Sequence, residues 1–231
     1  PQPTRHVSKN PFSISSCLLG HRQGGTVLFL LIFLGTAWVT RALLLAKAAA
    51  QVTIDASLAG AFFAGAIFDL GAALLAAIPL MVLLTVLPAG FFQRGWARGL
   101  AYAGFFGVQA GLCFVVVSEW LFWDEFGARF NFIAVDYLVY TKEVIGNIRE
   151  SYPMPLIFAG IFSATLAIGA AGWRTGLIQR WLQASPEPFR RRVATGGIWL
   201  ALAIGTGLLL DAEYLPGFAN NYNRELAKNG V

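Results

Sequence analysis

Five long apolar runs constrain the fold of this 231-residue sequence more than any other feature. A helix needs about 20 apolar residues to cross a hydrocarbon core of roughly 30 Å, and each run is near or above that length. Lipid offers the backbone no hydrogen bonds, and the runs lack the alternation of barrel strands, so each run is predicted to form a transmembrane helix. The predicted spans cover about residues 26–49, 60–87, 100–122, 156–173 and 193–210.

Composition excludes the other common classes of protein. Only 13% of the residues are charged and 57% are apolar, whereas a soluble domain carries about 25% charged residues. The 14% of aromatic residues excludes disorder. The two cysteines lie in unlike contexts and both histidines precede the first span, so neither a disulfide framework nor a metal site is predicted. The expected fold class is therefore all-α and polytopic.

Charge is distributed unequally between alternate loops. The N-terminal tail (1–25), the second loop and the fourth loop together carry ten cations and a single acid, Glu187. The segments 50–59, 123–155 and 211–231 carry nine acids and five cations. By the positive-inside rule, the N-terminus is predicted to be cytoplasmic and the C-terminus to lie outside the membrane. No basic patch carries the interleaved aromatics of a nucleic-acid site, so no nucleic-acid partner is expected.

The segment 123–155 differs from the other loops. Its polar residues Asp136, Glu143, Asn147 and Glu150 recur at spacings of seven, four and three, beside an apolar stripe of helical period. The pattern predicts an amphipathic helix in the outer interface, ended by Pro153. Aromatics typical of headgroup depth accompany it: Trp120, Trp123, Tyr137, Tyr140 and Tyr152.

A family resemblance is carried by this segment. The run from EF at 125–126 through RFNFIAVDYLVY at 129–140 to EVIGNIRESYP at 143–153 closely resembles the membrane domain of lipoteichoic-acid-synthase-like phosphoglycerol transferases of the Gram-negative type. The residues NYNRELAKNG at 221–230 and Phe68-Asp69-Leu70 fit the same family. The resemblance implies a five-helix anchor at 26–210 in the inner membrane of a bacterium, with its C-terminus in the periplasm. It also implies that 211–231 connects this anchor to a periplasmic domain of the alkaline phosphatase/sulfatase superfamily. That domain would use a Thr nucleophile and manganese to transfer glycerol phosphate from phosphatidylglycerol.

The residues of this chain contain no such catalytic constellation. We therefore predict no catalytic residue, metal ligand or cofactor here, and expect the chain alone to be inactive although the whole protein is a transferase. Expected partners are phosphatidylglycerol and the protein's own periplasmic domain. An alternative is a stand-alone subunit with a structural role in a larger membrane complex. The acceptor, and the choice between phosphoglycerol and phosphoethanolamine, stay open, and five spans without inverted halves do not favour transport.

Two ionisable residues lie well inside predicted spans. At about 1.5 Å rise per residue, Arg41 is about 22 Å from the cytoplasmic start of its helix and Asp69 about 14 Å from the outer start of the next. Because these depths differ by only a few ångström, which Arg can bridge, we predict an Arg41–Asp69 pair. Helix packing is the simpler role for the pair, and binding of a lipid phosphate by Arg41 is the other.

The outer loop supplies the remaining candidates. Glu119 lies where the third span reaches the interface, either solvated there or orienting a cation such as Arg129. Arg129, Lys142 and Arg149 are candidates for contact with an anionic lipid headgroup, since guanidinium binds phosphate with paired hydrogen bonds.

Small residues recur every fourth position in two spans. Gly107 with Gly111, and Gly197 with Ala201 and Gly205, are expected to mark close packing between helices within the chain.

Overall fold

The computed structural model describes residues 19–88, 90–131, 141–210 and 221–228. These residues form no strand, and five of their helices are long and apolar enough to cross a membrane, which confirms the predicted all-α fold. The five are α2 (Gly24–Lys47), α3 (Ala56–Ala76), α5 (Gly95–Phe126), α8 (Met154–Arg174) and α10 (Phe189–Leu209). Shorter elements are α4 (Ile78–Val86), η1 (Phe91–Gln93), α7 (Thr141–Ser151), α9 (Leu177–Leu182) and α11 (Asn221–Ala227).

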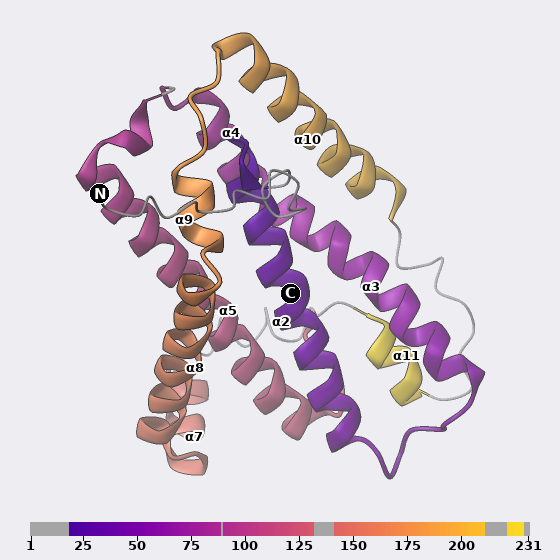
Figure 1. Cartoon of the computed structure of the whole chain (residues 1–231). Coiled ribbons are helices and arrows are strands. Elements are labelled where there is room, and N and C mark those ends of the chain that lie inside the picture. Colours follow the sequence, from indigo (N-terminus) through magenta and orange to yellow (C-terminus); the bar gives the residue numbers. More distant parts are fainter. Residues whose placement is uncertain (1–18, 89, 132–140, 211–220, 229–231) are drawn as a thin grey trace, which may run out of the picture.

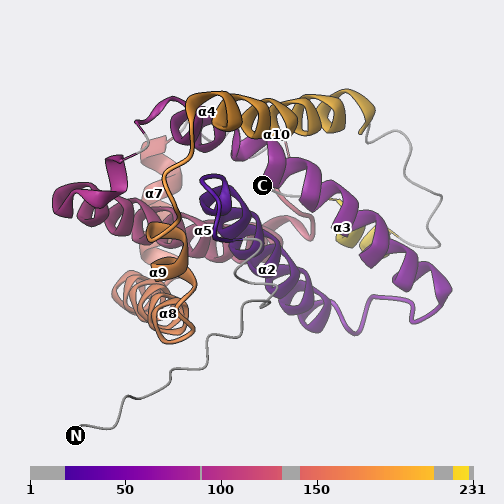
Figure 2. The ribbon, with the colours of Figure 1, turned by 45° about the horizontal axis from the view of Figure 1, so that its top comes forward.

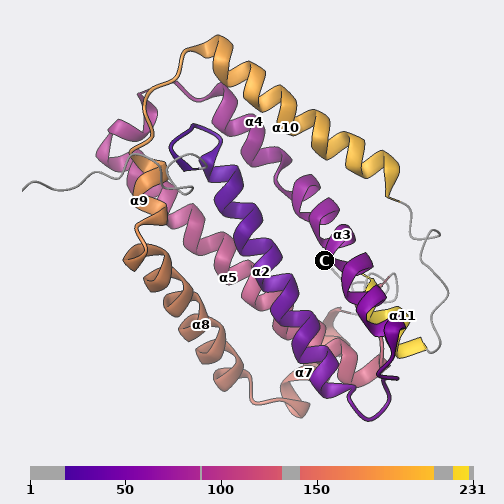
Figure 3. The ribbon, with the colours of Figure 1, turned by 45° about the vertical axis from the view of Figure 1, so that its right-hand side comes forward.

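The long helices lie side by side in an open row. Figure 3 shows the order α8, α5, α2, then α3 with α4, and finally α10, and the packing contacts follow the same order. Helix α9 packs at the end where α2 begins, and α11 packs on α3 and α2 near the end where α2 finishes (Figure 1). We call these the α9 end and the α11 end. Figure 2 shows that the row is curved, with α10 at one edge and α8 at the other.

The second span is broken, contrary to the single helix predicted over 60–87. Helix α3 ends at Ala76 and α4 begins at Ile78, with Pro79 in the first turn of α4. Proline has no N–H to donate to the preceding turn, and its ring crowds the carbonyl four residues earlier. The two helices still follow one another across the bundle (Figure 3), so the break does not change the number of spans.

The third span is longer than predicted. Helix α5 has 32 residues, which at 1.5 Å rise per residue is about 48 Å and exceeds a hydrocarbon core of roughly 30 Å. It ends at Phe126, and the next residue, Gly127, has a φ of 62°, the left-handed conformation that commonly terminates a helix. The chain turns back there, and this turn positions Arg129.

Beside an apolar core, the bundle buries several polar and ionisable side chains and exposes many large apolar ones. The fully buried side chains within the spans include Arg41, Asp69, Gln109 and Glu119, each 0% exposed. Large apolar side chains point outward instead, such as Phe162 at 65% and Leu208 at 82% exposure. Lipid is as apolar as leucine, so outward leucine costs nothing there, while ionisable groups must face the interior.

Close helix packing does not occur at the predicted stripes of small residues. A Cβ added at Gly107, Gly111, Gly197 or Gly205 would meet nothing within 4 Å, so the predicted packing role is wrong for these glycines. Close approach occurs elsewhere: Phe106 lies against Gly169, and Thr85 against Gly196. Spacing alone did not identify the interface because it does not say which face of a helix meets a neighbour.

Candidate functional site

Arg41 and Asp69 form the ion pair that their depths predict. Arg41 projects from α2 and Asp69 from α3, and both side chains are 0% exposed. Arg41 Nη2 donates to Asp69 Oδ2 over 2.5 Å. A charge buried in the bundle is expensive unless it is paired, so the two residues fix the register of α2 against α3.

Gly65 makes room for the Arg41 guanidinium. A Cβ at Gly65 would lie 1.8 Å from Arg41 Nη1 and 2.2 Å from Cζ. Gly65 and Asp69 are four residues apart and therefore share one face of α3. The guanidinium thus lies on the α3 backbone beside Asp69, and a larger residue at position 65 would force it to move from this place.

Arg129 and Glu119 form a second buried pair. After the turn at Gly127 the chain folds back along α5, and Arg129 donates from Nε to Glu119 Oε1 and from Nη2 to Oε2 at 3.0 Å. Both side chains are 0% exposed. Two parallel bonds between a guanidinium and a carboxylate give a defined geometry as well as energy. Glu119 is therefore not solvated at the interface; it orients Arg129, which is the second of the two predicted environments.

Helix α11 joins the two pairs. Arg41 Nη1 donates to the carbonyl of Leu226 and, at 3.5 Å, to that of Lys228. Arg129 Nη1 donates to the same Lys228 carbonyl at 2.6 Å. The last carbonyls of a helix have no partner within it and carry partial negative charge, so cations stabilise them. We call Arg41, Asp69, Glu119, Arg129 and the α11 carbonyls the buried charge network.

Further contacts attach the rest of α11. Asn223 Nδ2 donates to the Thr53 carbonyl at 3.1 Å and to Ser57 Oγ at 2.9 Å. Glu225 Oε2 accepts from the Arg129 backbone N–H at 3.3 Å. Leu226 is 0% exposed and packs with Leu44 and Trp123. Polar and apolar contacts therefore hold α11 on the bundle along its whole length.

The buried charge network is electrically balanced, with two guanidinium groups against two carboxylates. Its oxygens accept hydrogen bonds from neighbouring side chains, and no nucleophile adjoins them among the described residues. The described residues also contain no cluster of three or more His, Cys, Asp or Glu that could hold a metal ion. What this arrangement does chemically is bind a helix terminus at a fixed place.

The other two candidate cations lie outside this network, on α7. Lys142 and Arg149 are exposed and, being seven residues apart, lie on the same face of the helix. The apolar stripe of α7 adjoins them, and the acids Glu143 and Glu150 lie on the other side. Residues 132–140 of the predicted interfacial segment, including Tyr137 and Tyr140, lie outside the described residues. The described helix thus has a cation-edged apolar face of the kind that binds at a membrane surface.

Tyr152 connects the end of α7 to α5. Its hydroxyl donates to Asp124 Oδ2 at 3.5 Å, while Asp124 also pairs with Lys47 of α2. Burial, and then the Asp124 carboxylate, raise the pKa of Tyr152 above its ordinary value. The hydroxyl therefore stays protonated and able to donate.

A second group of buried arginines lies at the α9 end. Arg22 donates to the carbonyls of Leu84 (3.1 Å) and Leu87 (3.2 Å), and Arg192 donates to those of Thr85 (2.9 Å) and Leu87. They cap the C-terminus of α4 as Arg41 and Arg129 cap α11. Burial, and then the nearby Arg192, lower the pKa of Arg22. Sequence reasoning counted both residues only as loop cations, because capping partners distant in the chain leave no local signal.

Arg41 and Arg129 are thus enclosed by protein groups, whereas Lys142 and Arg149 are accessible. Lipid contact at each of the four stays a prediction. Comparison of the chain with family models, with curated proteins and with solved structures finds no match. The family resemblance therefore rests on the sequence motifs alone.

Proposed function

We propose that this chain is the membrane-anchor and lipid-docking domain of a phosphoglycerol-transferase-like enzyme of the sulfatase superfamily. In this proposal the α9 end is cytoplasmic and the α11 end faces the periplasm of a bacterial inner membrane. The catalytic domain, with its manganese ion, follows α11 and uses phosphatidylglycerol as donor.

The observation that carries the proposal is the fixation of α11 by the buried charge network. A tether that only retained a domain at the membrane would need no structured exit, and an exposed segment would serve. Here two buried arginines and a buried asparagine hold the exit helix. A chain leaving such a helix starts from a defined place and direction, as positioning an active site over lipid headgroups requires.

Helix α7 supports the lipid-docking part of the proposal. Each Lys or Arg near an anionic surface contributes about 1 kcal/mol to attraction, and Lys142 and Arg149 are placed together beside an apolar stripe. Their edge of α7 is suited to bind phosphatidylglycerol headgroups near the proposed catalytic domain.

Transferase activity tests the proposal directly. The protein expressed from the complete reading frame, in membranes with phosphatidylglycerol labelled in its headgroup glycerol, should transfer the labelled glycerol phosphate to an acceptor hydroxyl and release unlabelled diacylglycerol when manganese is present. The 231-residue chain alone should not. In that protein, Lys142→Gln combined with Arg149→Gln should raise KM for phosphatidylglycerol roughly tenfold or more, given about 1 kcal/mol per cation. The matched pair Glu143→Gln with Glu150→Gln should not raise it.

Two outcomes would overturn the proposal. One is a complete reading frame without a catalytic domain whose product purifies in fixed ratio with other membrane proteins, which is the result expected of a structural subunit. The other is an active enzyme whose KM is equally insensitive to both pairs of substitutions, which would remove the lipid-docking role.

A further inference from the structure

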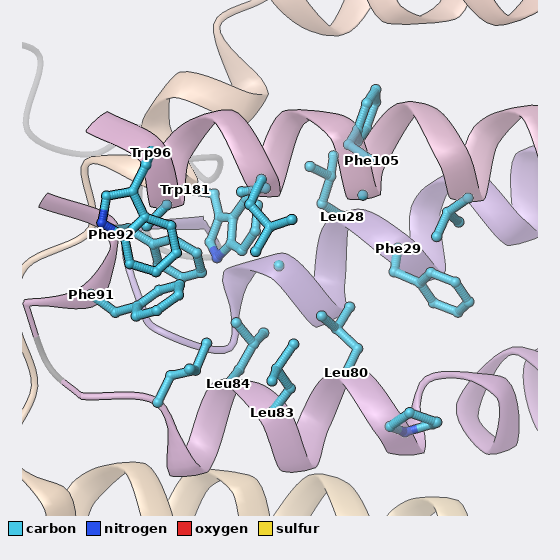
Figure 4. Close-up of a pocket in the computed structure, with 18 of the residues that line it drawn as sticks. Leu28, Phe29, Leu80, Leu83, Leu84, Phe91, Phe92, Trp96, Phe105 and Trp181 are labelled. Carbon is cyan, nitrogen blue, oxygen red and sulfur yellow. The ribbon is translucent and has the colours of Figure 1, made fainter. Parts of the chain in front are cut away.

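A large apolar cavity lies at the α9 end, away from the buried charge network. Its volume is about 740 Å³, within the range of roughly 300–1,000 Å³ typical of ligand sites. Figure 4 shows Leu80, Leu83 and Leu84 of α4 pointing toward α5, with Leu28 and Phe29 of α2 between the two helices. Every residue that lines it is apolar, so its natural contents are hydrocarbon and not water.

The cavity opens sideways, between α4 and α5. Leu83 is 52% exposed, Leu100 60% and Val108 42%, and all three line it. Along α5 the lining runs from Trp96 to Val108, which is about 18 Å at 1.5 Å per residue. One leaflet of a hydrocarbon core is about 15 Å deep, half of roughly 30 Å. The cavity thus opens toward lipid and has the depth of a single leaflet.

Aromatic rings line the end of the cavity that lies next to η1 and α9. Trp96 contacts Phe91 edge-on at 5.2 Å between ring centres, and Trp181 contacts Phe92 at the same distance. Figure 4 shows these four rings grouped at one end of the space. Aromatic rings concentrate at the level of lipid headgroups. We therefore place this aromatic end of the cavity, which we call its mouth, at the membrane interface.

Cations surround this mouth. Arg94 and Arg98 are exposed and lie on either side of Trp96 in the sequence, and the Arg22 guanidinium lies 4.6 Å above the Phe92 ring. The first turn of α5 contains no acidic residue, and among the described residues no side chain caps it. The positive end of the helix dipole therefore adds to the arginine charges. A group bound here should be anionic.

We propose that this cavity binds one acyl chain of an anionic phospholipid, with the lipid phosphate at Arg94 and Arg98. A protein helix is the other apolar occupant to consider. The cavity has the depth of one leaflet and exposed arginines beside its aromatic end, which matches a lipid tail with an anionic headgroup better than an apolar helix. An acyl chain is slender enough to fit. This site lies at the opposite end of the bundle from α7, the helix proposed to dock on lipid headgroups. It does not depend on the proposed transferase function.

Photo-cross-linking tests the site. The chain is reconstituted in phosphatidylcholine vesicles with a trace of phosphatidylserine that carries a diazirine on one acyl chain. Phosphatidylserine has no phosphoglycerol headgroup, so labelling is independent of the proposed substrate. We expect adducts to concentrate at residues 80–84 and 100–105, and a phosphatidylcholine probe with the same chain to label them roughly fivefold less for each arginine that engages the phosphate.

Two glycines of α5 provide a matched pair of variants. A side chain at Gly104 or at Gly107 would meet nothing within 4 Å, but only Gly104 lines the cavity. Gly104→Trp should reduce labelling roughly tenfold, as expected when about two methylene groups lose apolar contact, and Gly107→Trp should leave it unchanged. Arg94→Gln combined with Arg98→Gln should reduce labelling by the phosphatidylserine probe to the level of labelling by the phosphatidylcholine probe.

The wild-type adduct map does not depend on the folding of any variant. Adducts spread evenly over the outward faces of α8 and α10 would overturn the site, and so would equal labelling of the two glycine variants. Equal labelling by the two lipid probes would overturn the assignment of an anionic headgroup.

Discussion

Arg41 and Arg129 both donate from Nη1 to the main-chain carbonyl of Lys228, at 3.5 and 2.6 Å. Each guanidinium also holds its own carboxylate, Asp69 or Glu119. The C-terminus of α11 therefore bridges two ion pairs whose residues come from α2, α3, α5 and the turn that follows α5. Because the pairs and the docking of α11 share donors, loss of either pair should loosen α11 as well as the bundle.

Removal of the Asp69 carboxylate tests the first pair. Asp69→Ala leaves the Arg41 guanidinium buried without its counter-ion, which should lower the free energy of unfolding by about 3–5 kcal/mol. Arg41→Met added to Asp69→Ala should recover part of this loss, since no buried charge is then left unpaired. Thermal unfolding in detergent micelles, followed by circular dichroism, measures both. Substitution of an exposed acid, Glu143→Ala, serves as the control. If Asp69→Ala destabilises the chain no more than Glu143→Ala does, Asp69 does not stabilise the bundle by pairing with Arg41.

Alanine substitutions at two glycines of α3 distinguish crowding of Arg41 from the general effect of alanine on helix stability. Gly65→Ala places a Cβ 1.8 Å from Arg41 Nη1 and should destabilise the chain by about 1–3 kcal/mol through overpacking. Gly60→Ala, where a Cβ meets nothing within 4 Å, should be neutral or stabilise the helix by up to about 1 kcal/mol. The same unfolding measurement compares them. If the two substitutions have the same sign, the guanidinium does not lie on the α3 backbone.

The long helices and the Arg41–Asp69 pair could be predicted from the sequence because both follow from local quantities. Length and hydropathy define a span, and counting residues along two adjacent spans gives their depths. Gly65 could not be recognised in the same way. Its importance depends on which face of α3 meets α2, and Gly107 and Gly111, which have the more conspicuous spacing, face open space.

Helix α11 and the cavity show the other limit of sequence reasoning. Seven residues with the composition Asn-Tyr-Asn-Arg-Glu-Leu-Ala are too short to form a helix alone, so the segment was predicted only as a connection. Packing against α3 and the arginines that bind its carbonyls stabilise it. The cavity likewise depends on the separation of α4 from α5, which no pattern within either helix encodes.

Asn223 should control how often α11 lifts from the bundle. Asn223→Ala removes both hydrogen bonds to the segment before and at the start of α3, which should cost about 1–3 kcal/mol of local stability. Hydrogen exchange of the peptide covering 221–228 should become faster, with little change in α2 and α5. Arg224→Ala, an exposed neighbour on the same helix, is the control. Equal exchange in both variants would mean that Asn223 does not hold α11.

Low pH should weaken the N-terminal cap of α3, which lies beside the Asn223 contacts with Thr53 and Ser57. Asp55 caps α3, and the Ser57 hydroxyl followed by backbone N–H groups lowers the pKa of its carboxyl. A carboxyl with a lowered pKa contributes stability that is present above its ordinary pKa and lost as the pH falls through the lowered one. The protection factors of the Ser57 and Leu58 amides, which compare measured exchange with intrinsic exchange at the same pH, should therefore fall at acid pH. The Asp55→Ala chain should show low protection factors at these amides already at neutral pH. High protection in Asp55→Ala that does not change with pH would refute the capping role.

Arg192 provides the corresponding test at the α9 end. Its Nη1 donates to two carbonyls at the end of α4, and hydrogen bonds to charged groups contribute about 1.5–3 kcal/mol each. Arg192→Gln should destabilise the chain by an amount in that range, because the α4 carbonyls lose a buried cation. Arg191→Gln removes the same charge one residue earlier from an exposed position and should change stability by less than about 0.5 kcal/mol. Both are measured by thermal unfolding in the same micelles. Equal losses would mean that the net charge of the segment matters, and that capping of α4 by Arg192 does not.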